Sequence, residues 1–315
     1  MDEVFFEELG LPKVKYNLNI SSSLHGEMTA QIILASESIL IKEKPDWVLV
    51  QGDTNTVLAG ALTASKLGIR VGHIEAGLRS YDRTMPEEIN RVVTDHISDK
   101  LFVPTEKQAK ILTHEGIAKN NIVITGNTIV DAVYQNLSLM LSKTNLEHYR
   151  SEKYFLLTLH RPVNVDIKKN LTKIISTIET LSRQYGYPVY FPIHPRTKKQ
   201  INLFNIKINP KYLKLMSPVG YLEMLAMEVN SKLIFTDSGG IQEESCILKT
   251  PSITLRENTE RPETLDVGST ILTGLNQEKI IQATKIMLKK KRKWPNPFGD
   301  GKAWVKILHE ITQSS

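Results

Sequence analysis

The stretch Leu233–Glu244 reads LIFTDSGGIQEE and contains a strand, a glycine turn and the start of a helix. Its apolar run predicts a buried strand, and Ser238 with two glycines predicts a tight turn. Backbone N–H groups in such a turn can approach a ligand closely, and a helix N-terminus favours negative charge, so a diphosphate is the natural occupant. A carboxylate in the first turn, Glu243 or Glu244, can hydrogen-bond sugar hydroxyls. The alternative is a structural turn in which Ser238 caps the helix and the glutamates complement its dipole.

The same order of apolar run, turn and helix recurs along the chain and predicts an α/β protein with parallel sheets. In the first half we expect strands at Asp46–Gln51, Val71–Glu75, Leu101–Pro104 and Asn121–Thr125, and helices at Gly26–Glu43, Thr56–Leu67 and from Asp131 to about residue 141. In the second half we expect strands at Tyr154–Leu159, Val189–Ile193, Leu213–Met216, Leu233–Thr236 and Ser252–Leu255, and helices at Tyr221–Val229 and Gly240–Leu248. The charged stretch Ser142–Lys153 has no strand pattern and is expected to link two doubly wound domains with a cleft between them.

Composition excludes several classes of protein. The chain has 315 residues, of which 41% are hydrophobic and 23% charged, which is typical of a folded protein of two domains. It contains a single cysteine, Cys246, so an internal disulfide and a zinc ribbon are excluded. No apolar run approaches the ~18 residues of a membrane helix, and the acidic N-terminus lacks the features of a signal peptide. We therefore expect a cytoplasmic protein with no membrane partner.

The formal net charge of +6 could suggest a nucleic-acid partner. However, Lys289, Lys290, Lys291, Arg292 and Lys293 form one run, and without these five the balance is 6 − 5 = +1. The run follows apolar residues and is best explained as a solvated helix C-terminus, which favours positive charge. No aromatic-interleaved basic strand is present, so we expect no nucleic-acid binding.

Polar side chains directly after the apolar runs are the candidates for the site, because ligands bind beyond the carboxyl ends of parallel strands. His160 and Arg161 follow one run, and both suit an anionic ligand. The histidines have neither the H-x-x-x-H nor the H-E-x-x-H spacing, so no metal site is expected. The remaining candidates chosen by this criterion are Asp53, His73, Glu75, His194, Arg196 and Asp237.

A second constellation lies in GHIEAGLRSYDRTMPEEINR, Gly72–Arg91. Pro86 fits the first position of a helix, and Glu87 then lies in the first turn. Arg91 follows Glu87 by four residues and is expected on the same face. Two interpretations stay open: a surface ion pair of little energetic value, or a carboxylate held beside a cation and able to move a proton.

Taken together, the motifs are similar to those of the non-hydrolysing UDP-N-acetylglucosamine 2-epimerases. The resemblance extends from Val4–Pro12 to Asn296–Gly301 and includes QGDTNT, GHIEAGLRS, MPEEINR, TGNTIVDA, TLHRP, TDSGGIQEE and NTERPE in the family's order. It implies a GT-B-like fold of two Rossmann-like domains. The expected divisions are an N-terminal domain over 1–148, a UDP-binding domain over 149–297 and a helix over 298–315 that crosses back to the first domain.

The resemblance also implies an activity. Family members interconvert UDP-GlcNAc and UDP-ManNAc by expelling UDP to give 2-acetamidoglucal and adding it back, without a nicotinamide cofactor. It further implies a homodimer that serves polysaccharide biosynthesis. The implied acid–base carboxylates are Asp53, Glu75 and Glu87, with His160 and Arg91 stabilising the departing UDP or positioning the substrate. The implied binding residues are Ser238, Gly239 and Gly240 for the diphosphate, Glu244 for the ribose and His194 near a regulatory site.

Three departures from the family pattern are evident. Val163 stands where relatives carry a glutamate, and Met28 stands where many carry a glutamine near the regulatory site. The family's opening strand, Gly-Thr-Arg-Pro-Glu loop and first helix have no counterpart in this sequence, so the first domain is expected to be incomplete. The alternatives are a hydrolysing epimerase that releases ManNAc and UDP, a catalytically impaired member that binds nucleotide sugars and, least supported, a glycosyltransferase of the same fold.

Overall fold

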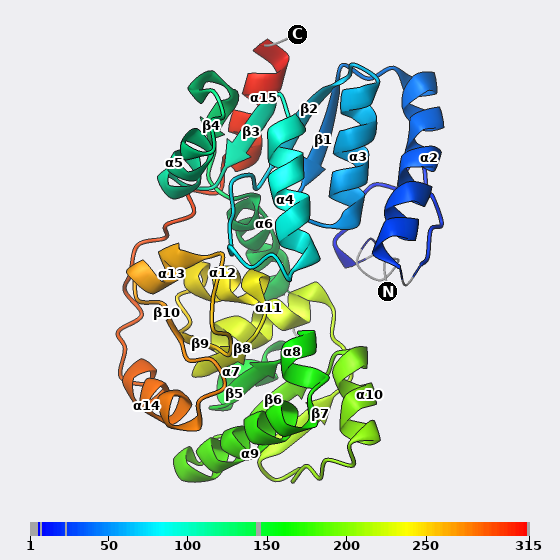
Figure 1. Ribbon diagram of the computed structural model, residues 1–315. Coiled ribbons are helices and arrows are strands. Elements are labelled where there is room, and N and C mark those ends of the chain that lie inside the picture. Colours follow the sequence, from blue (N-terminus) through cyan, green and yellow to red (C-terminus); the bar gives the residue numbers. More distant parts are fainter. Residues whose placement is uncertain (1–5, 7, 23, 143–145, 314–315) are drawn as a thin grey trace. The chain divides into compact units, whose positions relative to one another are not determined.

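The computed structural model describes residues 6, 8–22, 24–142 and 146–313 (Figure 1). Contacts divide the chain into two units, each described below by itself. The N-terminal unit comprises Lys13–Ala132 with Phe298–Ser315, and the C-terminal unit comprises Met1–Pro12 with Val133–Pro297. Of the Val4–Pro12 motif, residues 4, 5 and 7 lie outside the described residues, as do residues 143–145 of the expected linker.

The N-terminal unit is built on a parallel sheet in the order β1-β2-β3-β4. Apolar side chains from β1, β2 and α3, among them Val50, Val71 and Val57, form a core between sheet and helix. The strands are β1 (Trp47–Gln51), β2 (Arg70–Ile74), β3 (Lys100–Val103) and β4 (Ile122–Ile124), and the helices are α2 (His25–Glu43), α3 (Asn55–Lys66), α4 (Pro86–Ile97), α5 (Glu106–His114), η1 (Lys119–Asn121), α6 (Thr128–Ser142) and α15 (Ala303–Gln313).

The C-terminal segment belongs to this unit through specific contacts. Asp131 on α6 accepts hydrogen bonds from the backbone N–H groups of Ala303 (3.3 Å) and Trp304 (3.1 Å), which are otherwise unsatisfied at the start of α15. Gly126 has φ +87°, and a Cβ there would lie 2.9 Å from the carbonyl oxygen of Phe298. A glycine is therefore required where the two segments meet.

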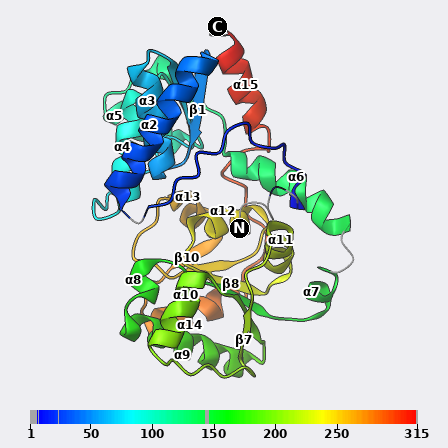
Figure 2. The same cartoon turned by 90° about the vertical axis from the view of Figure 1, so that its right-hand side faces the viewer.

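The C-terminal unit is built on a second parallel sheet, in the order β10-β9-β8-β5-β6-β7. Helices α9 and α14 pack together on one face, and α11 and α12 lie on the other (Figure 2). The strands are β5 (Phe155–Thr158), β6 (Val189–Pro192), β7 (Leu213–Met216), β8 (Leu233–Thr236), β9 (Ser252–Thr254) and β10 (Thr270–Leu272), and the helices are α7 (His148–Ser151), α8 (Pro162–Val165), α9 (Lys168–Tyr185), α10 (Pro195–Leu203), α11 (Tyr221–Asn230), α12 (Gly239–Ile247), α13 (Pro262–Asp266) and α14 (Gln277–Met287).

The strand order predicts where a ligand crevice lies in this sheet. From β5 the chain builds outward through β6 and β7, and it then returns to the other side of β5 to add β8, β9 and β10. The order therefore reverses between β5 and β8, and in parallel α/β sheets the crevice lies beyond the carboxyl ends of the two strands at such a reversal. These are the strands that His160 and Asp237 follow.

The structure confirms the expected parallel α/β units, and each expected strand is present within a residue or two of its predicted bounds. Strand β10 was not predicted, because only three residues at the edge of the sheet form it. Helix α6 begins at Thr128, before Asp131, and continues to Ser142 past the contact boundary at Ala132–Val133. The short α7 lies within the expected linker, and the basic run follows the end of α14 at Met287, as expected of a helix C-terminus.

Candidate functional site

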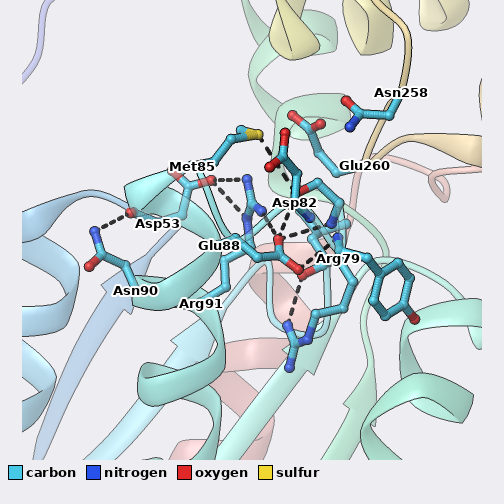
Figure 3. Close-up of polar contacts among 12 residues, drawn as sticks. Asp53, Arg79, Asp82, Met85, Glu88, Asn90, Arg91, Asn258 and Glu260 are labelled. Carbon is cyan, nitrogen blue, oxygen red and sulfur yellow. Dashed lines mark hydrogen bonds and ion pairs between the residues drawn. The ribbon is translucent and has the colours of Figure 1, made fainter.

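Asp53 lies in the turn that follows β1 and is held there by Arg91. The Arg91 guanidinium contacts one carboxylate oxygen of Asp53 twice, through Nη2 at 2.8 Å and Nε at 3.0 Å (Figure 3). Asn90 donates to the backbone carbonyl of Asp53 at 2.9 Å. Gly52 makes the turn possible with φ +84°, a conformation that residues with a side chain rarely adopt. Two consecutive residues of α4 thus fix the position of the Asp53 loop.

The second partner of Arg91 is Glu88 and not Glu87. Nη1 of Arg91 lies 2.5 Å from the Glu88 carboxylate, which also accepts from the backbone N–H groups of Ser80 and Tyr81 at 2.9 Å (Figure 3). Burial disfavours the charge on Glu88, but these donors and Arg91 lower its pKa. The Glu87–Arg91 ion pair that the i, i+4 spacing suggested is therefore wrong. Arg91 pairs instead with Glu88, three residues before it.

Glu87 is left as an uncommitted carboxylate at the start of α4. It is partly exposed, and the structure gives it neither a hydrogen bond nor an ion pair with any described residue. A carboxylate in that condition keeps all its lone pairs for a substrate. Both interpretations weighed for this residue placed it beside Arg91, and the structure pairs Arg91 with Asp53 and Glu88 instead.

Glu75 occupies a strained position at the end of β2. Its φ is +68°, in the left-handed region that disfavours side chains. Its Oε2 lies 3.8 Å from the point where a Cβ on Gly52 would be, so its carboxyl group is adjacent to the Asp53 loop. Strain retained in a residue of this kind is typical of a functional site.

His73 lies in the core of the N-terminal unit and contacts the backbone of the Asp53 loop. The ring is fully buried, with Nδ1 2.6 Å from an oxygen of Asp95 and Nε2 2.8 Å from the carbonyl oxygen of Gly52. Arg79 lies 2.7 Å from the other oxygen of Asp95, and Glu115 binds Arg79 in turn. Burial opposes ionisation of Asp95, but His73 and Arg79 lower its pKa. The sequence pattern selected His73 and missed Asp95, which lies on α4 and not at a strand end.

In the C-terminal unit, Asp237 organises the end of β5. Its carboxylate accepts from the backbone N–H groups of His160 at 3.1 Å and Arg161 at 3.1 Å, and from the Asn164 side chain at 3.0 Å. The His160 ring, which is 43% exposed, lies with Nδ1 3.2 Å from the same carboxylate. Asp237 is fully buried, which opposes its ionisation, but the hydrogen bond from His160 and the backbone donors lower its pKa. The carboxylate therefore orients His160 and leaves the outer face of the ring accessible.

His194 lies beside His160 and has a structural task. The two ring centroids are 5.8 Å apart, and Nδ1 of His194 accepts from the Arg196 N–H at 3.2 Å to cap α10. Burial, followed by the positive charges of His160 and Arg196, lowers the pKa of His194. The ring is accordingly suited to act as a neutral hydrogen-bonding group.

Helix α12 begins at the crevice with the predicted glycine turn. Ser238 caps it by accepting from the Ile241 N–H at 3.4 Å, which confirms the cap without excluding a ligand at the free N–H groups of the first turn. A Cβ on Gly239 would lie 3.0 Å from Glu260 Oε1, so the turn packs tightly against Glu260. Arg256 holds Glu260 at 2.6 Å, and Arg161 lies 3.4 Å from it.

The sequence pattern missed Arg256 and Glu260. Arg256 follows β9 by two residues, so the strand-end criterion that selected Asp53 could have selected it. Glu260 lies in a loop within the NTERPE motif and had no periodic signal. Burial opposes the charge of Glu260, but Arg261, Arg256 and Arg161 together depress its pKa strongly. These residues bring guanidinium groups to the start of α12, where a diphosphate would need them.

The structure shows the surroundings of two of the three departures from the family pattern. Val163 is 58% exposed on α8, so the apolar side chain takes no part in the core. Met28 lies on α2, with its sulfur 3.7 Å from the Asn55 side chain. Asn55 in turn contacts His25 and Asn90, which connects Met28 to the Asp53 loop through two side chains.

Within the described part of the chain, no group of three or more histidine, cysteine, aspartate or glutamate side chains is arranged to hold a metal ion. Among the helices that the structure describes, none has the length and hydropathy needed to cross a membrane.

Comparisons with known proteins place this geometry in a family. The family model described as UDP-N-acetylglucosamine 2-epimerase matches residues 1–312. A UDP-N-acetylglucosamine 2-epimerase of Methanocaldococcus jannaschii is 56% identical over 99% of this chain and 87% of its own length, and one of Methanococcus maripaludis is 56% identical with the same two coverages. The crystal structure of the M. jannaschii UDP-GlcNAc 2-epimerase in complex with UDP-GlcNAc and UDP superposes with a TM-score of 0.94, covering 99% of this chain and 88% of that chain at 56% identity.

Proposed function

This chain belongs to the UDP-N-acetylglucosamine 2-epimerase family, and from that premise we propose that it inverts C2 of UDP-GlcNAc to give UDP-ManNAc, reversibly. One observation carries the proposal most directly. The crevice beyond β5 and β8 combines an oriented His160, a helix N-terminus and a set of guanidinium groups, which together suit a leaving diphosphate.

The chemistry divides into two half-reactions that balance. A base removes the proton from C2 while the C1–O bond breaks, its electron pair leaves with UDP, and the sugar becomes 2-acetamidoglucal with a C1=C2 double bond. UDP then adds back through oxygen to C1, and a proton is delivered to the opposite face of C2. Since removal and delivery occur on opposite faces, two separate acid–base groups are needed.

We assign the acid–base work to the N-terminal unit. Glu87 has no partner among the described residues and can take or give a proton, and Glu75 supplies a further carboxylate that is presented by a strained backbone. Asp53 is held in place by Arg91, which suits it to orient the substrate. Arg91 therefore acts on the substrate indirectly, by holding Asp53.

We assign the leaving group to the C-terminal unit. His160, held by Asp237, donates to the departing phosphate oxygen, and Ser238, Gly239 and Gly240 supply the N–H groups and hydroxyl at the start of α12. Glu244 lies on the second turn of α12, and not on the first turn as the sequence had suggested, because the helix begins at Gly239. It accepts from the ribose hydroxyls. His194, beside His160, is proposed to contact a second nucleotide sugar at a regulatory site.

Product analysis by ¹H NMR tests the function. Purified protein incubated with UDP-GlcNAc should produce UDP-ManNAc until the two reach a constant ratio. Accumulation of free ManNAc with UDP would identify a hydrolysing epimerase instead. UDP binding without any turnover would identify the impaired member, an alternative that the exposed Val163 keeps open.

The setting of the enzyme completes the proposal. We propose a cytoplasmic homodimer, as the family implies. Cys246 is a buried free cysteine, and burial raises the pKa of its thiol. The thiol is therefore unreactive, which fits a protein of a reducing compartment. Light scattering on a sizing column would report the mass, and a monomer at micromolar concentration would contradict the dimer.

A further inference from the structure

Glu228 is a carboxyl group with nothing around it to hold a negative charge. It lies on α11, its exposed fraction is 0%, and neither of its oxygens accepts a hydrogen bond from a donor in the described structure. No cation of the described chain forms an ion pair with it. A carboxylate in such a position would suffer the full cost of desolvation, so the neutral acid is the stable form.

The polar group that Glu228 meets is the carboxyl of Glu244. The two carboxyl groups, one from α11 and one from α12, lie within hydrogen-bond reach of each other. Two ionised carboxylates have no proton to share and repel each other, so this contact requires that one of them carry a proton. Burial raises the pKa of both carboxyl groups, and Glu228, which is 0% exposed against 7% for Glu244, is the one that keeps the proton.

We propose that Glu228 is a protonated carboxylic acid that donates a hydrogen bond to Glu244 and thereby fixes the carboxylate that binds the ribose of the nucleotide. Glu228 is then a positioning residue, since it is fully buried and acts through Glu244 alone. The part that concerns ribose rests on the proposed function, whereas the shared proton does not. With Glu228 as the donor, Glu244 keeps its other lone pairs for the ligand.

Among the residues that the structure describes, no cation acts on the Glu228 carboxyl group. The titratable side chains that interact with Glu228 are Glu244 of α12, Tyr221 of its own helix and Tyr154 before β5. Tyr154 donates its hydroxyl proton to the carbonyl oxygen of Met227 at 2.7 Å, so it is not available to Glu228. Burial, with the neighbouring Glu244, raises the pKa of Glu228 well above its ordinary value, in agreement with the geometry.

Two replacements of similar size separate donation from packing. In Glu228→Gln the amide N–H₂ still donates to Glu244, whereas in Glu228→Met no donor remains. Isothermal titration with UDP should give an affinity within about 3-fold of the natural protein for Gln and a loss of about 10-fold or more for Met. With UDP-GlcNAc as substrate, the loss should fall on KM, with kcat much less affected. A Gln variant that binds UDP as poorly as the Met variant would overturn the proposal.

The stability of the fold reports the shared proton independently of any ligand. The unfolded glutamate ionises near pH 4.3, while the folded Glu228 stays protonated, so the natural protein loses stability as pH rises above that value. The Gln variant has no such loss. Its Tm should therefore match the natural protein near pH 4.5 and exceed it by roughly 3 °C or more near pH 8.

Glu223→Gln is the matched control on the same helix, because Glu223 accepts from the Tyr149 hydroxyl and has no part in the pair. Its Tm should not rise above that of the natural protein as the pH increases from 4.5 to 8. A Tm gap for Glu228→Gln that stays constant from pH 4.5 to 8 would contradict the shared proton. Failure of epimerisation with these binding and unfolding results intact would refute only the proposed function.

Discussion

Arg91 determines which of the carboxylates around it can move a proton. It binds Asp53 and Glu88 and leaves Glu87, one residue earlier, without a partner among the described residues. A carboxylate bound by a guanidinium has lone pairs engaged in that contact, whereas an unpaired carboxylate can present all of them to a substrate. The difference between neighbours on one helix turn is thus a difference in chemical role.

Replacing Glu87 should therefore stop catalysis and spare binding. We expect Glu87→Gln to lower kcat by a factor of about 10²–10⁴, as is usual when a general acid–base group is lost. Its affinity for UDP should be unchanged, since UDP is assigned to the other unit. Glu106→Gln, which removes an exposed acid from the first turn of α5, is the control and should retain full activity. Equal loss of turnover and of UDP affinity in Glu87→Gln would indicate a structural role.

The backbone of Glu75 gives a second prediction at this scale. At φ +68° a residue with a side chain is less stable than glycine by ~1 kcal/mol. Glu75→Gly should therefore unfold at higher urea than Glu75→Ala, although both lose the carboxylate and, with it, turnover. At Glu37, exposed in the middle of α2, the order should reverse, because glycine weakens a helix. An alanine variant at position 75 that is the more stable of the two would contradict the strain.

At the scale of elements, Asp237 joins the ends of β5 and β8. It is buried, and its pKa is lowered, so the charged form is favoured in the folded protein. An unfolded aspartate titrates near pH 3.9, so the stabilisation is present above that pH and lost as the pH falls through the lower folded value.

We expect Asp237→Asn to lower the free energy of unfolding by about 2–4 kcal/mol at pH 7, because the donors of His160 and Arg161 would lose their charged acceptor. The deficit should shrink as the pH falls below 4. Urea unfolding between pH 2.5 and 7 measures it. Asp166→Asn, which removes an exposed ion pair with Arg196, should cost less than about 1 kcal/mol. A deficit at position 237 that is independent of pH would contradict the charged acceptor.

The order of strands and helices could be predicted because each buried strand is a continuous apolar run followed by a turn. Side chains at strand ends, such as Asp53 and His160, could be selected by the same rule. Asp95 and Glu228 could not, because they lie inside helices and acquire their roles only from what packs against them. The pairing of Arg91 was mispredicted because helical spacing allows either Glu87 or Glu88 as its partner. The backbone N–H groups of Ser80 and Tyr81 hold the Glu88 carboxylate in place, and they lie before the helix begins.

At the scale of the whole molecule, the two units have separate cores and separate tasks in the proposed reaction. A ligand stabilises the part of a protein that binds it, by about 2.7 kcal/mol at 100 times its Kd. If the units unfold in two calorimetric steps, UDP should raise the Tm of one and leave the other nearly unchanged. Asp131→Ala, which frees the start of α15, should lower only the step that UDP does not raise. A UDP-stabilised step that also responds to Asp131→Ala would contradict the assignment of UDP to the C-terminal unit.

The central claim is that C2 is inverted through elimination and re-addition of UDP. The most direct test is to incubate the protein in D₂O with UDP-GlcNAc carrying ¹⁸O in the bond between C1 and the β-phosphorus. If the C1–O bond breaks and re-forms, the label should move to the non-bridging oxygens of the β-phosphate, and deuterium should replace the hydrogen at C2 in both epimers. UDP-ManNAc that retains all of the label in the bridge would indicate that C1–O does not break, and would contradict the account.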